Sequence, residues 1–143
     1  MRKLSRFLTL TACLLSLYGC QKEEFAEAPV YGKIYCSSPH PEVGDTVTVL
    51  VEVLDAGNRL NSAEYRWKIR SPFTTYNKTV KTMRKAGQKS ITEVPSFEWV
   101  FREDGKHRLE LTAKFSYSMG DANSVMRGYS TARGEIEVYP KSN

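Results

Sequence analysis

Apolar and polar residues alternate along much of the chain, and this period of two predicts strands rather than helices. The clearest stretch is residues 46–53, where Val47, Val49 and Val51 share one face and Thr48 and Glu52 lie on the other. Alternation with β-branched residues is typical of a half-buried strand. The same pattern recurs at residues 64–69, 97–102 and 108–117, and a last strand is expected at 125–139 with a bulge at Gly134.

Short polar segments separate these stretches and have the composition of turns. Residues 55–58 and 119–123 combine Asp, Asn and Gly, and residues 103–106 contain Asp-Gly. Residues 71–92 are harder to interpret, because they are basic and Ala86-Gly87 would break a helix; an edge strand followed by a loop is expected there. Five to seven strands with turns between them predict an all-β fold, an antiparallel β-sandwich. Its predicted core comprises Val49, Val51, Trp67, Trp99, Leu109, Leu111 and Phe115.

The first twenty residues have the layout of an export signal. Arg2, Lys3 and Arg6 precede an apolar run at residues 7–18, and Gly19-Cys20 follows. The run is shorter than the ~20 residues that a membrane-spanning helix needs. The small residue before a cysteine resembles the lipobox of bacterial lipoproteins. That resemblance implies a signal peptide at 1–19 and a Cys20 that carries the acyl chains; a plain secretory peptide with a chance cysteine is the alternative.

The residues after Cys20 form a short charged stretch, Gln21-Lys22-Glu23-Glu24-Phe25. It resembles the export tag of Bacteroidota surface lipoproteins, which implies a lipid-anchored protein on the outer face of the outer membrane. Residence on the periplasmic face is the alternative. We interpret residues 20–29 as the acylated cysteine and its tether, residues 30–139 as one domain and residues 140–143 as a tail.

Removing the signal peptide changes the charge of the protein. The whole chain has 21 basic and 16 acidic residues, and three of the basic ones lie in the signal. The mature chain therefore carries 18 basic against 16 acidic residues, a net charge of +2. This balance removes the main support for nucleic-acid binding. Cys13 would leave with the signal and Cys20 would be acylated, so no intramolecular disulfide is expected. Cys36 is expected to be a small buried apolar side chain, with an intermolecular or reactive thiol as the alternative.

Three segments resemble PKD-like and other immunoglobulin-like domains. They are the strand entry Val43-Gly44-Asp45-Thr46-Val47, the core tryptophan in Tyr65-Arg66-Trp67, and the strand at residues 104–111. The resemblance covers residues 30–139 in order, although His107-Arg108 replaces the usual aromatic residue of the last segment. It implies an immunoglobulin-like (PKD-like) β-sandwich.

The sequence offers little for catalysis. His40 and His107 are the two histidines, and neither has the spacing of a zinc site or a nucleophile motif beside it. We therefore expect no enzyme activity, no metal and no cofactor.

A binding role has better candidates in the basic residues between the second and third predicted strands. They are Lys78, Lys81, Arg84, Lys85 and Lys89, with no acidic residue among 71–92. Such a stretch would attract an anionic partner; the alternative is a solvated segment that protects a sheet edge. Exposed aromatic residues could also stack on sugars: Tyr76, Tyr117, Tyr129 and Tyr139.

The function expected from these features is that of a lipid-anchored binding or adhesion module that recognises a protein or glycan. One alternative is a structural accessory lipoprotein of an envelope complex. Another is an inhibitor or immunity lipoprotein. The membrane is contacted only through the lipid anchor, and the identity of the partner is not encoded in any motif.

Overall fold

The computed structural model describes residues 26–118 and 125–143, which form seven strands and no helix. The strands are β1 (Val30–Cys36), β2 (Thr46–Asp55), β3 (Leu60–Arg70), β4 (Thr75–Met83), β5 (Ser96–Val100), β6 (Gly105–Ser118) and β7 (Val125–Val138). The all-β class predicted from the alternating pattern is therefore confirmed. Strand β4 lies in the basic segment that was expected to hold an edge strand.

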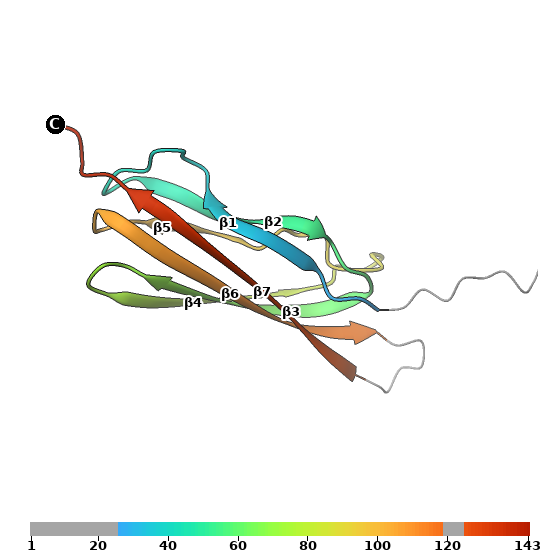
Figure 1. Cartoon of the computed structure of the whole chain (residues 1–143). Helices are drawn as coiled ribbons and strands as arrows, with labels where there is room; N and C mark the ends of the chain where they lie inside the picture. The colour runs from blue at the N-terminus through green and yellow to red at the C-terminus, as the bar shows by residue number, and fades with distance from the viewer. Residues whose placement is uncertain (1–25, 119–124) are drawn as a thin grey trace, which may run out of the picture.

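The strands form one mixed sheet in the order β4-β3-β6-β7-β1-β2-β5. Strand β1 is antiparallel to β2 but parallel to β7, with Lys33 beside Arg133. The prediction of a purely antiparallel sheet is therefore wrong. Alternation along a strand determines which face is buried, but it does not determine which strands become neighbours. Here the first and last strands of the chain lie side by side and run in the same direction (Figure 1).

Gly134 lies at the point where β1 and β7 approach most closely. A Cβ atom at this position would stand 2.5 Å from the carbonyl oxygen of Ile34, so a side chain would force the two backbones apart. The predicted bulge at Gly134 is wrong, because β7 keeps a regular register with β6 through Leu109↔Gly134 and Leu111↔Ala132. The glycine therefore serves the contact between strands and leaves β7 regular.

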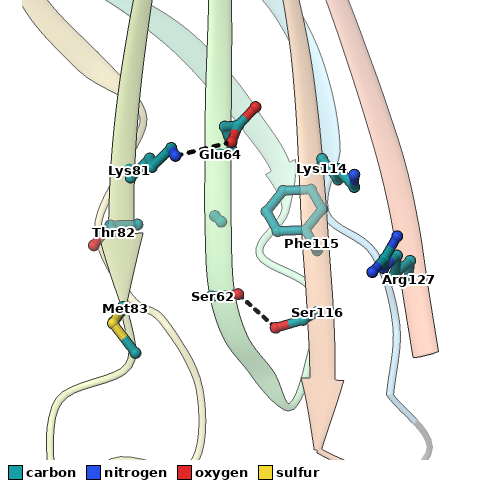
Figure 2. Close-up of a pocket in the computed structure, with 10 residues that line it drawn as sticks. Ser62, Glu64, Lys81, Thr82, Met83, Lys114, Phe115, Ser116 and Arg127 are labelled. Atoms are coloured by element: carbon teal, nitrogen blue, oxygen red, sulfur yellow. Dashed lines mark hydrogen bonds and ion pairs between the residues drawn. The ribbon is translucent and has the colours of Figure 1, made fainter. Parts of the chain in front are cut away.

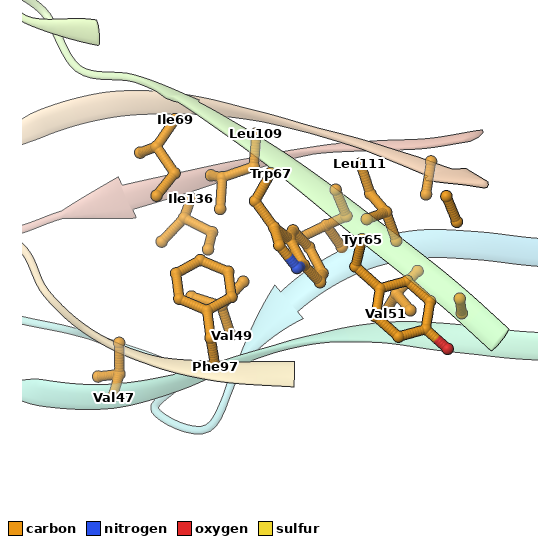
Figure 3. Close-up of a cluster of buried hydrophobic side chains, with 14 of the residues drawn as sticks. Val47, Val49, Val51, Tyr65, Trp67, Ile69, Phe97, Leu109, Leu111 and Ile136 are labelled. Carbon is orange, nitrogen blue, oxygen red and sulfur yellow. The ribbon is translucent and has the colours of Figure 1, made fainter. Parts of the chain in front are cut away.

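The sheet curls into a half-barrel, so the inner faces of its two ends lie opposite each other (Figure 1). Figure 3 shows the result: Trp67 from β3 points toward Phe97 from β5, and their ring centroids are 5.0 Å apart. Each fully buried large apolar side chain stabilises the fold by about 1.5–3 kcal/mol. The curl therefore supplies the core that a flat sheet of this size would lack.

Most of the predicted core is confirmed. Six of the seven predicted side chains are buried: Val49, Val51, Trp67, Leu109, Leu111 and Phe115. Trp99 is different, because it is only half-buried. It belongs to edge strand β5, which has a hydrogen-bonded neighbour on one side only. The prediction that Trp99 is a core residue is therefore wrong.

Several single residues also depart from expectation. Tyr117, proposed as an exposed aromatic, is buried, whereas Tyr129 and Tyr139 are exposed. Cys36 is half-buried, its Sγ lies 3.1 Å from the carbonyl oxygen of Ser38, and burial raises the pKa of its thiol. His107 is fully buried in the core, where its ring packs against that of Phe101.

The segment just before β1 contacts the domain, although the sequence assigned it to the tether. Glu27 and Asn58 exchange two backbone hydrogen bonds, of 3.1 and 2.9 Å. The hydroxyl of Ser130 donates to the carbonyl of Pro29. The expected anchor, Cys20, lies outside the described residues. Within the described ranges, 26–118 and 125–143, there is no helix long and apolar enough to cross a membrane.

Candidate functional site

The five cations proposed from the sequence do not form one patch. Lys78 and Lys81 both lie on β4, three positions apart, so they project from opposite faces of the sheet. Lys81 is on the outer face, with its Nζ 3.5 Å from a carboxylate oxygen of Glu64. Lys78 stands opposite the buried Trp67 in the register of β3 and β4 and is therefore on the inner side.

The other three cations lie in the connection between β4 and β5. Arg84 holds this connection in place, because its guanidinium donates to Oδ1 of Asn61 at 3.0 Å and to the carbonyl of Gln88. Lys85 lies 3.1 Å from a carboxylate oxygen of Glu93, and this hydrogen bond is the largest cause that lowers the pKa of the Glu93 carboxyl. Lys89 is exposed. Two of the three therefore have partners within the domain.

A larger basic surface lies on the outer face of strands β4, β3, β6 and β7, which we call the basic face. Its residues alternate with the core residues of the same strands, so they point away from the core. Nine cations stand on it: Arg66, Lys68, Arg70, Lys81, Lys106, Arg108, Lys114, Arg127 and Arg133. Four carboxylates stand among them: Glu64, Glu110, Glu135 and Glu137. Nine positive against four negative charges give this face a net charge of +5, whereas the other described residues carry eight positive and nine negative charges, a net charge of −1.

The carboxylates of the basic face are shared between cations. Glu110 lies 3.7 Å from Arg70 and 3.8 Å from Arg133. Glu135 likewise lies 3.4 Å from Lys106 and 3.5 Å from Arg108. Exposed ion pairs of this kind contribute only about 0–1 kcal/mol each. Sharing one carboxylate between two cations leaves a positive surplus at each position.

Glu64 is the third shared carboxylate. It accepts from Arg66 at 2.5 Å and from Lys81 at 3.5 Å. The hydrogen bond from Arg66 is the largest cause that lowers the pKa of the Glu64 carboxyl. Glu64 therefore stays ionised, and its single charge is divided between two cations.

Three cations of the basic face have no carboxylate partner within the described residues: Lys68, Lys114 and Arg127. Figure 2 shows Lys114 on β6 and Arg127 on β7 beside a shallow depression of about 470 Å³. Lys81 and Glu64 border it from β4 and β3, and the hydroxyls of Ser62 and Ser116 meet at 2.5 Å within it. The depression thus offers two free cations and two hydroxyls to a bound anion.

A second depression lies at the other end of the basic face. It measures about 570 Å³ and is bordered by Lys33, Arg70, Arg108 and Arg133. Arg70 and Arg108 stand directly opposite each other in the register of β3 and β6. Like charges in that position repel each other across a sheet. An anion bound there would relieve this repulsion.

Within the described part of the chain, no group of three or more histidine, cysteine or acidic side chains could hold a metal ion. His40 packs its ring against Tyr139 at 5.6 Å between centroids, whereas His107 is buried, with Nδ1 3.1 Å from the carbonyl oxygen of Gly105. Period-two alternation with Leu109 and Leu111 could have identified His107 as a core residue. The same alternation could have identified the cations of β3, β6 and β7 as one surface.

The sequence matches no protein-family model and no curated protein. We therefore infer the function from the residues of this chain alone.

Proposed function

We propose that the protein is a lipid-anchored, non-catalytic binding module of the cell envelope that holds an anionic partner against its basic face. The observation that carries this proposal is the uneven distribution of charge. A mature chain of net charge +2 presents a net charge of +5 on one face of one sheet. Such a concentration of charge of one sign attracts an oppositely charged partner and speeds its encounter with the protein.

The composition of the basic face also favours recognition of an anion. Five of its nine cations are arginines, whose planar guanidinium groups donate two parallel hydrogen bonds to a carboxylate, sulfate or phosphate. The face is broad and its depressions are shallow, which suits an extended acidic glycan or an acidic protein surface better than a small molecule. The accessory and inhibitor alternatives would use the same face for a protein partner.

We also propose that the protein is exported and anchored to the outer membrane by a lipid. The basic n-region, the apolar run at residues 7–18 and the Gly19-Cys20 pair support a signal peptide and acylation of Cys20. The charged residues that follow support the outer surface of the outer membrane, with the periplasmic face as the alternative. Two or three acyl chains on one residue would hold the domain firmly, since each buried CH₂ contributes about 0.8 kcal/mol.

We further propose that the half-barrel is an immunoglobulin-like, PKD-like β-sandwich. The strand order supports this, because the contiguous strands β5, β2 and β1 at one end of the curled sheet would make one layer of the sandwich, and β7, β6, β3 and β4 would make the other. Contact between Trp67 and Phe97 across the core also supports two packed layers. Domains of this architecture bind partners through loops, edges and sheet faces.

The experiment that tests this function uses cells that display the full chain. Cells with the wild-type protein should bind fluorescent dextran sulfate, and cells without it should not. The double variant Lys114→Glu with Arg127→Glu should bind much less at an equal amount of protein. The double variant Lys89→Glu with Lys141→Glu, which changes the net charge equally outside the basic face, should bind as the wild type does. Equal binding by the first variant and the wild type would refute the proposal.

A further inference from the structure

A separate cleft lies between the two edge strands, β4 and β5. It measures about 470 Å³, which is within the range of roughly 300–1,000 Å³ typical of small-ligand sites. Tyr76 of β4 and Trp99 of β5 line it, and Lys78, Glu98 and Arg102 belong to its lining as well. Glu98 alternates with Phe97 and Trp99 along β5, so its side chain projects from the face of the strand opposite these two rings. Lys78 is on the inner side of the sheet, so this cleft is distinct from the basic face.

The aromatic residues of the cleft are unusual for this domain. Tyr76 and Trp99 are both half-buried, and their ring centroids lie 5.3 Å apart in a T-shaped pair. In such a pair the edge of one ring meets the face of the other, so aromatic surface remains for a further contact. Trp99 therefore packs against the core and also forms one wall of an open cleft.

The charged residues of the cleft have unused hydrogen-bonding groups. Lys78, Glu98 and Arg102 are exposed, and none makes a hydrogen bond or ion pair with the described residues. An inward-pointing lysine on an edge strand also prevents edge-to-edge association, and this role explains Lys78 alone. It does not explain why Arg102 and two half-buried rings line the same cleft.

We propose that this cleft binds one pyranose ring of a neutral saccharide. The C–H face of the sugar would lie on Trp99 and Tyr76, where it replaces water against aromatic surface. The hydroxyls would accept hydrogen bonds from Lys78 and Arg102. A neutral sugar is favoured because the lining of the cleft is balanced in charge. It holds two carboxylates, Glu98 and Glu103, and two cations, Lys78 and Arg102. This site goes beyond the proposed function and does not depend on the basic face.

The two tryptophans of the chain give this proposal a direct measurement. Trp67 is buried and Trp99 half-buried, so acrylamide quenching of fluorescence reports mainly on Trp99. The full chain is held in a zwitterionic detergent without a sugar headgroup, and neutral methyl pyranosides and N-acetylhexosamines are added up to about 50 mM, above the millimolar Kd expected of one weakly held ring. We expect at least one of these probes to protect Trp99 from quenching in a saturable manner.

Variants decide whether the protection arises in the cleft. Arg102→Met and Lys78→Met remove polar groups without contacts to the domain, so the fold should persist, and each should weaken binding about tenfold. Tyr129→Ala, an exposed tyrosine of the basic face, should have no effect. The charge-reversal variant Lys114→Glu with Arg127→Glu should also keep the protection, which separates this site from the proposed function.

Two outcomes would overturn the proposal: absence of protection by every probe, or protection of Arg102→Met and Lys78→Met equal to that of the wild type. Protection of Trp99 by an extended peptide but by no saccharide would also overturn it, in favour of strand addition to the β5 edge.

Discussion

Tyr76 and Trp99 pack together with their ring centroids 5.3 Å apart, although their strands are the opposite edges of a seven-stranded sheet. The contact continues inward, since Trp99 lies 6.0 Å from Phe97 and Phe97 lies 5.0 Å from Trp67. Four rings thus connect β4, β5 and β3 across the opening of the half-barrel. The curl of the sheet therefore depends on aromatic packing at the place where no backbone hydrogen bonds join the two edges.

Trp67 is the innermost ring of this series, and its removal should destabilise the whole domain. Trp67→Ala is expected to lower the free energy of unfolding by about 3–5 kcal/mol, because it leaves a large cavity in the core. That is a substantial part of the ~5–15 kcal/mol available to a small domain. Urea unfolding followed by circular dichroism measures the loss. Tyr129→Ala, at an exposed position, should change stability by no more than ~0.5 kcal/mol. Similar losses in the two variants would contradict the assigned core.

The contact between β1 and β7 predicts that Gly134 cannot carry a side chain. Gly134→Ala should destabilise the fold by about 1–3 kcal/mol, because the new Cβ would meet backbone atoms of Ile34 that cannot move alone. Gly32→Ala is the matched control, since the nearest atoms there belong to the exposed side chain of Glu52, which can swing away. Thermal unfolding of both variants tests this. Equal melting temperatures would show that β1 does not lie close against β7.

Two partly or fully buried tyrosines predict a loss of stability in alkali. Burial is the largest cause that raises the pKa of both Tyr31 and Tyr65. A raised pKa in the folded state means that the stabilisation is complete below the unfolded value of about 10 and is lost as the pH rises above it. Urea unfolding should therefore need less denaturant at about pH 11 than at about pH 8.

The double variant Tyr31→Phe with Tyr65→Phe should lose part of this pH dependence, because both ionisable phenols are removed together. Tyr129→Phe, an exposed position, should retain it. The same pH dependence in the double variant and the wild type would show that these two phenols are not its source.

The proposed anchor leads to a prediction about fractionation. Cys20→Ser should move the protein out of the membrane fraction, because the acylated side chain is absent. Cys36→Ser should leave it there, since Cys36 lies in β1 of the domain. Detergent-phase partitioning of cell extracts gives the answer. A membrane-bound Cys20→Ser protein would show that another feature holds the chain at the membrane.

The strands and most of the core could be predicted from the sequence. Alternation in a strand puts residues two apart on one face, so Val49, Val51, Leu109 and Leu111 are identified as buried without knowledge of the fold. The pairing of strands could not be predicted in this way. Parallel contact between β1 and β7 depends on long-range closure of the chain, and the partial exposure of Trp99 depends on the edge position of β5.

The basic face was missed for the same reason. The sequence draws attention to cations that are close along the chain, such as Lys78, Lys81 and Lys85. The sheet instead brings together Lys114 and Arg127, which come from different strands and stand on neighbouring positions of one surface. Charges that form a surface in a β protein are spaced two apart within a strand and across neighbouring strands, so they are recognised only when the strand order is known.

The rate at which purified protein associates with immobilised dextran sulfate is the most direct test of the basic face. The wild-type rate should fall steeply with added salt, because the Debye length shrinks from about 10 Å at 0.1 M to about 3 Å at 1 M. Lys114→Glu with Arg127→Glu should associate slowly even at low salt, whereas Lys89→Glu with Lys141→Glu should follow the wild type, since exposed charges act mainly on encounter. If both double variants associate at the same rate, binding follows net charge alone and the basic face is not the binding surface.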